Sequence, residues 1–182
     1  MHDIRIIPAV RNDAELSDAL NSDCGLIFDL NPDLLTLKKR VDAVHSSGKK
    51  IYIHFDLAGG IGKDKTGMIY VKAVGVDGII STRVNIIKLA HEVGLFTVQR
   101  FFIVDSHSID TTVDSAKTAK PDMIEIMPGI LSKVIKNIKK KLDTPIIAGG
   151  LIETKEEAEN ILKSGASAIS TGNKLLWKHK GE

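Results

Sequence analysis

TPIIAGGLIETKEEAENILKSGASAISTGN, residues 144–173, contains a strand, a helix and a second strand in succession. The first strand runs into a glycine pair at 149–150, the helical segment ends at Gly165, and the second strand runs into a Thr-Gly-Asn turn at 171–173. In eight-stranded α/β barrels, the loops after the seventh and eighth strands, together with a helix amino terminus, commonly bind phosphate. The stretch therefore predicts a site for a phosphorylated small molecule.

The rest of the chain repeats this alternation of short β-branched runs with segments of helical period, which is typical of parallel strands joined by crossover helices. Strands are expected at residues 4–10, 25–30, 50–56, 78–81, 96–103, 123–127, 145–148 and 166–170. Helices are expected at residues 13–21, 34–46, 65–74, 84–93, 109–119, 130–140 and 154–163, with a last one at 173–177.

Eight strand–helix units favour a compact eight-stranded parallel (β/α)8 TIM-type barrel, because an open sheet in a chain of this size needs only five or six strands. The 182 residues fall below the roughly 200 of the smallest usual barrels. The expected loops are correspondingly short. An open flavodoxin-like sheet is the alternative architecture.

Several helix ends are marked by their residue types. Glycines at 48, 75, 94 and 165 stand where a left-handed helix cap is needed. Thr154 and Glu157 form the pattern of a capping box at the start of the last long helix. These signals fix the helix boundaries better than the apolar period does.

Composition indicates one domain spanning residues 1–182, because a chain with 43% hydrophobic and 26% charged residues can bury one core. The net charge of +2 does not by itself indicate a nucleic-acid partner. Cys24 is the single cysteine, so no internal disulfide forms, and its apolar neighbours indicate a buried strand. With no signal segment and no membrane-length apolar run, we expect a cytoplasmic protein without membrane contact.

Polar side chains stand at the carboxyl ends of most expected strands, where a barrel places its chemistry. They are Asp29, His54, Asp56, Ser81, Arg83, Gln99, Arg100 and Glu125. A charged group at the end of a buried strand must be paired, bound to a ligand or turned to solvent. For any one of them, an ion pair between neighbouring strands is an equally good interpretation.

Arg83 and Arg100 are the expected phosphate ligands, because guanidinium donates two parallel hydrogen bonds to an oxyanion. The glycine turns would bring backbone donors to the same phosphate, although turn geometry alone also explains them. Asp56 and Glu125 are acceptors suited to ligand hydroxyls. In a second hypothesis, Asp29, Asp56 and Glu125 bind a magnesium ion or act as acid and base in catalysis. No Schiff-base lysine, metal-ligand spacing or nucleophile elbow supports an enzyme.

Four segments resemble the glycerol uptake operon antiterminator family across nearly the whole chain. They are HFDLAGGIGKDKTG (54–67), VDGIISTRVNIIKLAHEVGLFTVQRFFIVDS (76–106), PDMIEIMPG (121–129) and PIIAGGLIETKEEA (145–158). The resemblance implies a barrel-fold regulator, not an enzyme, that responds to glycerol 3-phosphate and binds the messenger RNA leader of a glycerol operon. It implies no cofactor and no metal, and the sequence leaves a homo-oligomer open.

The family positions present are Asp56, Ser81, Thr82, Gln99, Arg100, Glu125, Pro128, Gly129, Gly149 and Gly150. Arg83 stands where lysine is frequent, and Gly59 stands where the family often has glutamate. The expected ligand site consists of Asp56, Arg83, Arg100, Glu125, Gly129, Gly149, Gly150, Thr171, Gly172 and Asn173. The alternative function is a small barrel enzyme, an isomerase, lyase or phosphohydrolase, acting on a phosphorylated metabolite.

Support for RNA binding within the sequence is limited to three basic clusters. They are Lys133, Lys136, Lys139, Lys140 and Lys141; Lys38, Lys39 and Arg40; and Lys174, Lys178 and Lys180. Such clusters contact phosphates, but helices of a barrel also carry lysine because they face water. Aromatic residues make up 4% of the chain, so few bases can be stacked. The RNA-contacting surface is not predicted.

Overall fold

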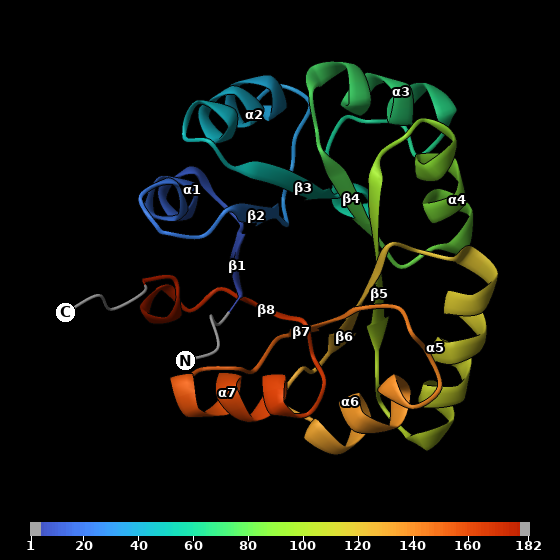
Figure 1. Ribbon diagram of the computed structural model, residues 1–182. Coiled ribbons are helices and arrows are strands. Elements are labelled where there is room, and N and C mark those ends of the chain that lie inside the picture. The colour runs from blue at the N-terminus through green and yellow to red at the C-terminus, as the bar shows by residue number, and fades with distance from the viewer. Residues whose placement is uncertain (1–4, 179–182) are drawn as a thin grey trace.

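A computed structural model describes residues 5–178. All eight strands are parallel neighbours in chain order, and β1 pairs with β8, so the sheet closes into a barrel ringed by helices (Figure 1). The (β/α)8 prediction is confirmed, and closure through the β1–β8 pair excludes the open sheet. No helix within residues 5–178 is long and apolar enough to cross a bilayer.

The strands are β1 (Ile6–Val10), β2 (Leu26–Asp29), β3 (Lys50–His54), β4 (Gly78–Ser81), β5 (Phe96–Phe102), β6 (Met123–Met127), β7 (Ile146–Gly149) and β8 (Ala168–Thr171). The helices are α1 (Asp13–Leu20), α2 (Leu37–Ser46), α3 (Lys65–Val74), α4 (Val84–Glu92), α5 (Ser106–Ala119), α6 (Ser132–Lys139) and α7 (Lys155–Lys163). Two 3-10 turns, η1 (Phe55–Leu57) and η2 (Lys174–Leu176), follow β3 and β8.

Several boundaries differ from the prediction, and two of them lie at the carboxyl end of the barrel. The third strand stops at His54 instead of Asp56, because the chain turns into η1. The expected helix at 173–177 is the 3-10 turn η2, in which Asn173 accepts from the Leu175 N–H and the Trp177 indole donates to the Thr171 carbonyl. Local side-chain hydrogen bonds therefore hold a 3-10 turn where a helix was expected.

The core has two parts, as expected for a barrel whose strands alternate inward and outward. Inside the barrel lie Ile7, Ala9, Phe28, Tyr52, Ile80, Val98, Ile147 and Ala168. A larger cluster fills the space between strands and helices, where outward-facing strand residues meet the apolar faces of the helices. The inner cluster fixes which strand positions point into the barrel.

The predicted helix signals are present. Gly48, Gly75, Gly94 and Gly165 all have left-handed backbone angles, with φ between 73° and 109°. Thr154 and Glu157 form the capping box at the start of α7. Cys24 is buried, as predicted, although it lies just before β2, and burial raises the pKa of its thiol.

Candidate anion site at the carboxyl end of the barrel

One layer of polar side chains lies above the apolar filling of the barrel. His54, Arg100 and Ser170 stand two residues beyond Tyr52, Val98 and Ala168, and therefore share their inward direction. Glu125 occupies the same layer on β6, directly opposite Arg100 in the β5–β6 register. All four are at least nine-tenths buried. Charged groups at this depth need partners.

Arg100 and Glu125 form a buried ion pair at the centre of this layer. The Arg100 Nε donates to Glu125 Oε2 at 2.6 Å, and the Ser170 hydroxyl donates to Glu125 Oε1 at 2.5 Å. The ion pair between neighbouring strands, which the sequence left as an alternative to a ligand role, is thus present. Within residues 5–178, the Nη atoms of Arg100 have no acceptor. Two nitrogens of the guanidinium remain available to an oxyanion.

Gly149 lacks a side chain because this ion pair occupies the space. A Cβ at position 149 would lie 2.6 Å from both Glu125 Oε1 and Ser170 Oγ. Gly129 has a similar role, since its Cβ would lie 2.6 Å from the Gly149 nitrogen. The Gly129 N–H donates to the Gly149 carbonyl at 2.6 Å, so it is not free for a ligand. Both glycines permit close packing of main chain.

Free backbone donors do occur at the two corners. The N–H groups of Leu151 and Gly172 have no acceptor among residues 5–178. Gly150 and Leu151 are consecutive left-handed residues, with φ of 76° and 59°. Leu151 is strained in this conformation, and such strain concentrates at binding sites. The corners are adjacent, because Gly149 pairs with Ser170 in the β7–β8 register.

The side chains of Thr171 and Asn173 hold the two corners together. The Thr171 hydroxyl donates to the Ile152 carbonyl at 3.2 Å, and the Asn173 amide donates to the Glu153 carbonyl at 2.7 Å. Both side chains therefore tie the loop after β8 to the loop after β7. Their positions bring Gly172 beside Gly150 without using any of the free backbone donors.

Asp56 organises the loops after β3 and β4. Its Oδ1 accepts from the Ser81 hydroxyl at 2.7 Å and from the Arg83 guanidinium, and its Oδ2 accepts from the Thr82 N–H at 2.8 Å and from the Thr82 hydroxyl. Burial alone would raise the pKa of Asp56, but these hydrogen bonds outweigh it and lower the pKa. The carboxylate is ionised and fully engaged in this arrangement.

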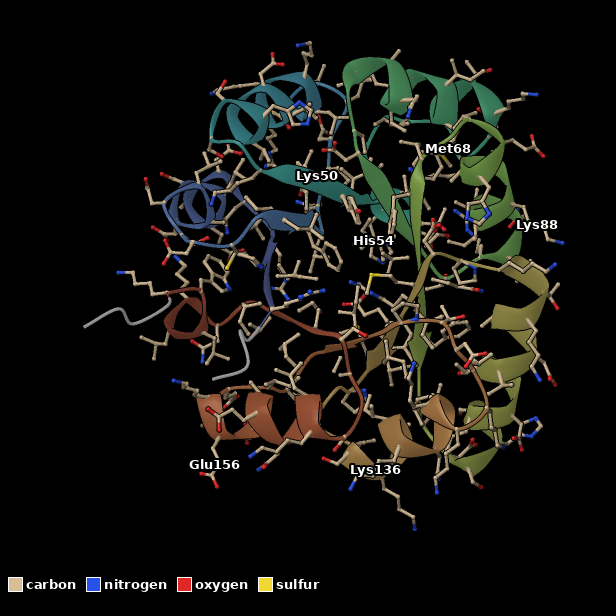
Figure 2. All side chains as sticks on the ribbon, viewed as in Figure 1. Lys50, His54, Met68, Lys88, Lys136 and Glu156 are labelled. Atoms are coloured by element: carbon tan, nitrogen blue, oxygen red, sulfur yellow. The ribbon has the colours of Figure 1, made fainter. Side chains whose placement is uncertain are left out.

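His54 is the inward-facing group whose bonding is incomplete. Its side chain is 5% exposed, and its Nδ1 has no partner among the described residues. Burial, reinforced by the charge of Arg100, lowers the pKa of His54 to about 4. The ring is therefore neutral near pH 7, with one donor and one acceptor nitrogen. Figure 2 labels His54 at the end of β3, near the centre of the ring of strands. The sequence analysis found it at a strand end without assigning it to the ligand.

Two polar residues from the strand ends lie outside the barrel mouth. Asp29 points outward and binds Arg40 of α2 at 2.9 Å, while burial raises its pKa. Gln99 also points outward, and its amide donates to Ser115 of α5 at 2.9 Å. The second hypothesis, in which Asp29 shares a magnesium or acid–base site with Asp56 and Glu125, finds no support here, because Asp29 faces α2 and pairs with Arg40. No group of three metal-ligating side chains occurs within residues 5–178.

Two cations near the mouth were missed by the sequence analysis. Arg11 follows β1 directly, and its Nη1 lies 3.3 Å from where a Gly172 Cβ would be. Lys63 folds back onto the loop after β3, where it donates to the carbonyls of Ala58 and Ile61 and lies 5.3 Å from the centre of the Phe55 ring. The rule that polar residues at strand ends matter would have found Arg11 had it been applied to the first strand.

Ion pairs reduce the number of unpaired positive charges in the three basic clusters. Arg40 is buried against Asp29 and Asp13, and Lys38, Lys141 and Lys174 pair with Asp42, Asp110 and Asp18. Lys180 lies outside the described residues. Lys133 and Lys136 on α6 and Lys140 at its C-cap are exposed, make no salt bridge within residues 5–178, and have the spacing of one helical face. Figure 2 labels Lys136 on the outer side of α6.

Two cavities lie away from this site. One of about 340 Å³ lies at the amino-terminal end of the barrel, lined by Ile7, Cys24, Met123 and Ala168 among others. Another of about 290 Å³ lies between α5 and α6, beside Lys140 and Lys141. Neither shares a residue with the polar layer. The features that mark the carboxyl end of the barrel as a candidate site are its charged side chains, its free backbone donors and the buried His54.

The fold and the site together define a (β/α)8 barrel with a layer of buried polar side chains at its carboxyl end. Residues 6–177 match the family described as glycerol-3-phosphate responsive antiterminator. The chain belongs to this family. An uncharacterised Escherichia coli K12 protein, YgcP, is 36% identical over 173 residues, covering 94% of this chain and 91% of that protein.

Two solved structures extend the comparison. The glycerol uptake operon antiterminator regulatory protein from Listeria monocytogenes superposes with a TM-score of 0.91 at 35% identity, covering 100% of this chain and 97% of the other. A glycerol uptake operon antiterminator-related protein from Thermotoga maritima gives a TM-score of 0.86 at 32% identity, covering 97% and 99%. The barrel is thus shared along the full length of these relatives.

Proposed function

We propose that this protein is a glycerol 3-phosphate sensor that acts as a transcription antiterminator, binding the ligand at the carboxyl end of the barrel and the messenger RNA leader of a glycerol operon elsewhere. The family and its solved members support the regulatory role. The single observation that carries the ligand half is the adjacent pair of corners after β7 and β8 with free backbone donors.

The phosphate is placed at these corners for electrostatic reasons. The N–H groups of Leu151 and Gly172 are free, and backbone donors arranged around a concavity bind oxyanions. Arg100 offers its two Nη atoms from the barrel interior while Glu125 holds its Nε. A phosphate monoester offers anionic oxygens to both sets of donors, whereas glycerol alone offers only neutral hydroxyl acceptors.

The glycerol end is placed toward β3. His54 has one unpartnered nitrogen there, and its neutral ring can donate to or accept from a hydroxyl. Asp56 is a poorer hydroxyl acceptor than the sequence suggests, because its oxygens already accept from Ser81, Thr82 and Arg83. In this proposal Asp56 and Arg83 form the wall of the site and Glu125 orients Arg100.

Sensing without turnover agrees with the side chains in the polar layer. Within the described strands, no lysine or cysteine points into the barrel near its carboxyl end, so the layer contains no candidate for a Schiff base or a thiolate nucleophile. The buried arginine and carboxylate neutralise each other. The site is equipped to bind an anionic ester, which is what a sensor requires.

Calorimetric titration with glycerol 3-phosphate tests the ligand half with a matched pair of variants. Gly150→Asp places a carboxylate among the free donors, and Gly150→Asn has nearly the same shape without the charge. Both tolerate the left-handed backbone better than other residues do. We expect Gly150→Asp to abolish binding and Gly150→Asn to retain most of it. Equal affinities in the two variants would refute the placement of the phosphate.

The RNA half is tested by transcription through the operon leader. We expect read-through to rise with wild-type protein and glycerol 3-phosphate, because the ligand shifts the protein toward the conformer that binds RNA. Gly150→Asn should respond to the ligand and Gly150→Asp should not. Read-through that is independent of the ligand in the wild type would contradict a sensor.

A further inference from the structure

Arg11 has a fixed main chain at the rim of the barrel. Its N–H donates to Glu15 Oε2 at 2.6 Å, and its carbonyl accepts from the Asn31 amide at 3.5 Å. Asn12 then caps the first turn of α1 by accepting from the Glu15 N–H. The backbone is therefore held by α1 and by the loop after β2. The long side chain starts from a defined point.

The side chain of Arg11 is directed toward the corner after β8. Arg11 continues the inward-facing series of Ile7 and Ala9 on β1, and β1 pairs with β8 through Pro8 and Thr171. Its Nη1 lies 3.3 Å from the point where a Gly172 side chain would begin. A glycine at 172 thus leaves room for the guanidinium directly over the turn whose N–H is free.

The guanidinium of Arg11 has no carboxylate partner in the part of the chain that the structure describes. Arg40, Arg83 and Arg100 each pair with a carboxylate, and so does Lys174 of the same turn. Arg11 itself appears in no ion pair, and Glu15 accepts from its main-chain N–H. An unpaired arginine beside unpaired backbone donors concentrates positive potential at one point.

We propose that Arg11 is a phosphate-binding residue of the ligand site and closes over the corner after β8. In the closed order of strands, β1 lies opposite β5, so Arg11 and Arg100 approach the phosphate from opposite sides. Arg11 contributes a bidentate contact to the non-bridging oxygens from the rim, and Arg100 contributes one from the interior. This inference rests on the proposed function and adds a residue to it.

The test compares Arg11→Ala, Arg11→Lys and the control Lys174→Ala by calorimetric titration with glycerol 3-phosphate and, separately, with inorganic phosphate. Lys174→Ala removes the same charge from the same corner, but Lys174 is paired with Asp18. A hydrogen bond to a charged group is worth about 1.5–3 kcal/mol, so Arg11→Ala should weaken both ligands roughly 10- to 100-fold. Arg11→Lys should recover part of the loss, because it keeps the charge without the bidentate geometry. Lys174→Ala should stay within about twofold of wild type, as surface pairs contribute little.

The outcomes separate this inference from the proposed function. If Arg11→Ala binds glycerol 3-phosphate as tightly as the wild type does, the role of Arg11 is overturned and the proposed function is unaffected. If the wild type binds inorganic phosphate but not glycerol 3-phosphate, the proposed ligand is overturned. The titrations with inorganic phosphate then show whether Arg11 binds phosphate. Wild type that binds neither overturns both. Because the Arg11 guanidinium makes no hydrogen bond within residues 5–178, the alanine variant should keep the wild-type melting temperature.

Discussion

At the scale of single residues, the mouth of the barrel combines satisfied and unsatisfied groups. Glu125 and Asp56 accept from every donor within reach, whereas His54 is buried with a free nitrogen. A buried polar atom without a partner costs about 1–3 kcal/mol. That cost is offset when a ligand supplies the missing hydrogen bond. The free nitrogen is consistent with selection for binding over stability.

The pH dependence of unfolding tests the state of His54. Its pKa of about 4 in the folded protein lies below the usual 6.5, so the unfolded chain takes up a proton that the folded protein does not as the pH falls from 6.5 toward 4. Stability contributed by neutral His54 is therefore present above pH 6.5 and is lost below it. A shift of two to three units corresponds to about 3 kcal/mol.

Urea unfolding of wild type and His54→Gln between pH 7 and pH 4 measures this effect. We expect the loss of stability on acidification to be about 3 kcal/mol smaller in His54→Gln, because glutamine does not titrate. Parallel pH profiles for the two proteins would show that His54 titrates normally in the folded state.

At the scale of elements, glycines determine how the loops pack on the barrel. Gly129 lets the loop after β6 lie against the end of β7, and Gly59 makes room for Asp33, whose Oδ2 would be 2.7 Å from a Cβ at position 59. Asp33 and Gly59 form a bridge that delays the start of α2 to Leu37. Glycine at position 59 therefore has a local packing reason.

Gly129→Ala tests this packing. Its new methyl group would lie 2.6 Å from the Gly149 nitrogen and 2.7 Å from the Ala148 carbonyl carbon, and main chain cannot yield as a side chain does. We expect a loss of about 2–3 kcal/mol in unfolding free energy. The control is Gly25→Ala, where a Cβ meets nothing within 4 Å. An equally small effect in both variants would contradict the packing role.

Much of this architecture follows from the sequence, but parts of it do not. Strand and helix periods, the glycine caps and the Thr154 capping box are local signals, and they gave the barrel correctly. The inward or outward direction of a strand-end residue depends on register, which is a tertiary property. Register is why the sequence alone cannot show that Asp29 faces α2. It is also why the sequence cannot decide whether Arg100 and Glu125 pair with each other or bind a ligand.

At the scale of the whole molecule, unpaired positive charge is distributed unevenly. On the helical ring, ion pairs neutralise Lys38, Lys141 and Lys174, while α6 keeps Lys133, Lys136 and Lys140 without acidic partners among the described residues. These three cations lie within two helical turns of one another. If the protein binds an RNA leader, α6 offers the stronger electrostatic surface.

A triple variant tests this surface. Changing Lys133, Lys136 and Lys140 to Gln should weaken binding to the leader in filter assays. It should also reduce the slope of log affinity against log salt by about 2, since each phosphate contact with a single strand contributes roughly 0.7. The matched control changes Lys38, Lys141 and Lys174 to Gln. An unchanged slope in the first variant would exclude α6 as the RNA-binding face.

The 3-10 turn that replaces an eighth helix has an optical consequence. Trp177, the single tryptophan of the chain, is buried there, and its indole N–H bonds the carbonyl of Thr171, next to Gly172. Any rearrangement of that corner changes the hydrogen bond and the polarity around the ring. The chain therefore contains one tryptophan, hydrogen-bonded to the rim of the barrel, whose emission can be followed without labelling.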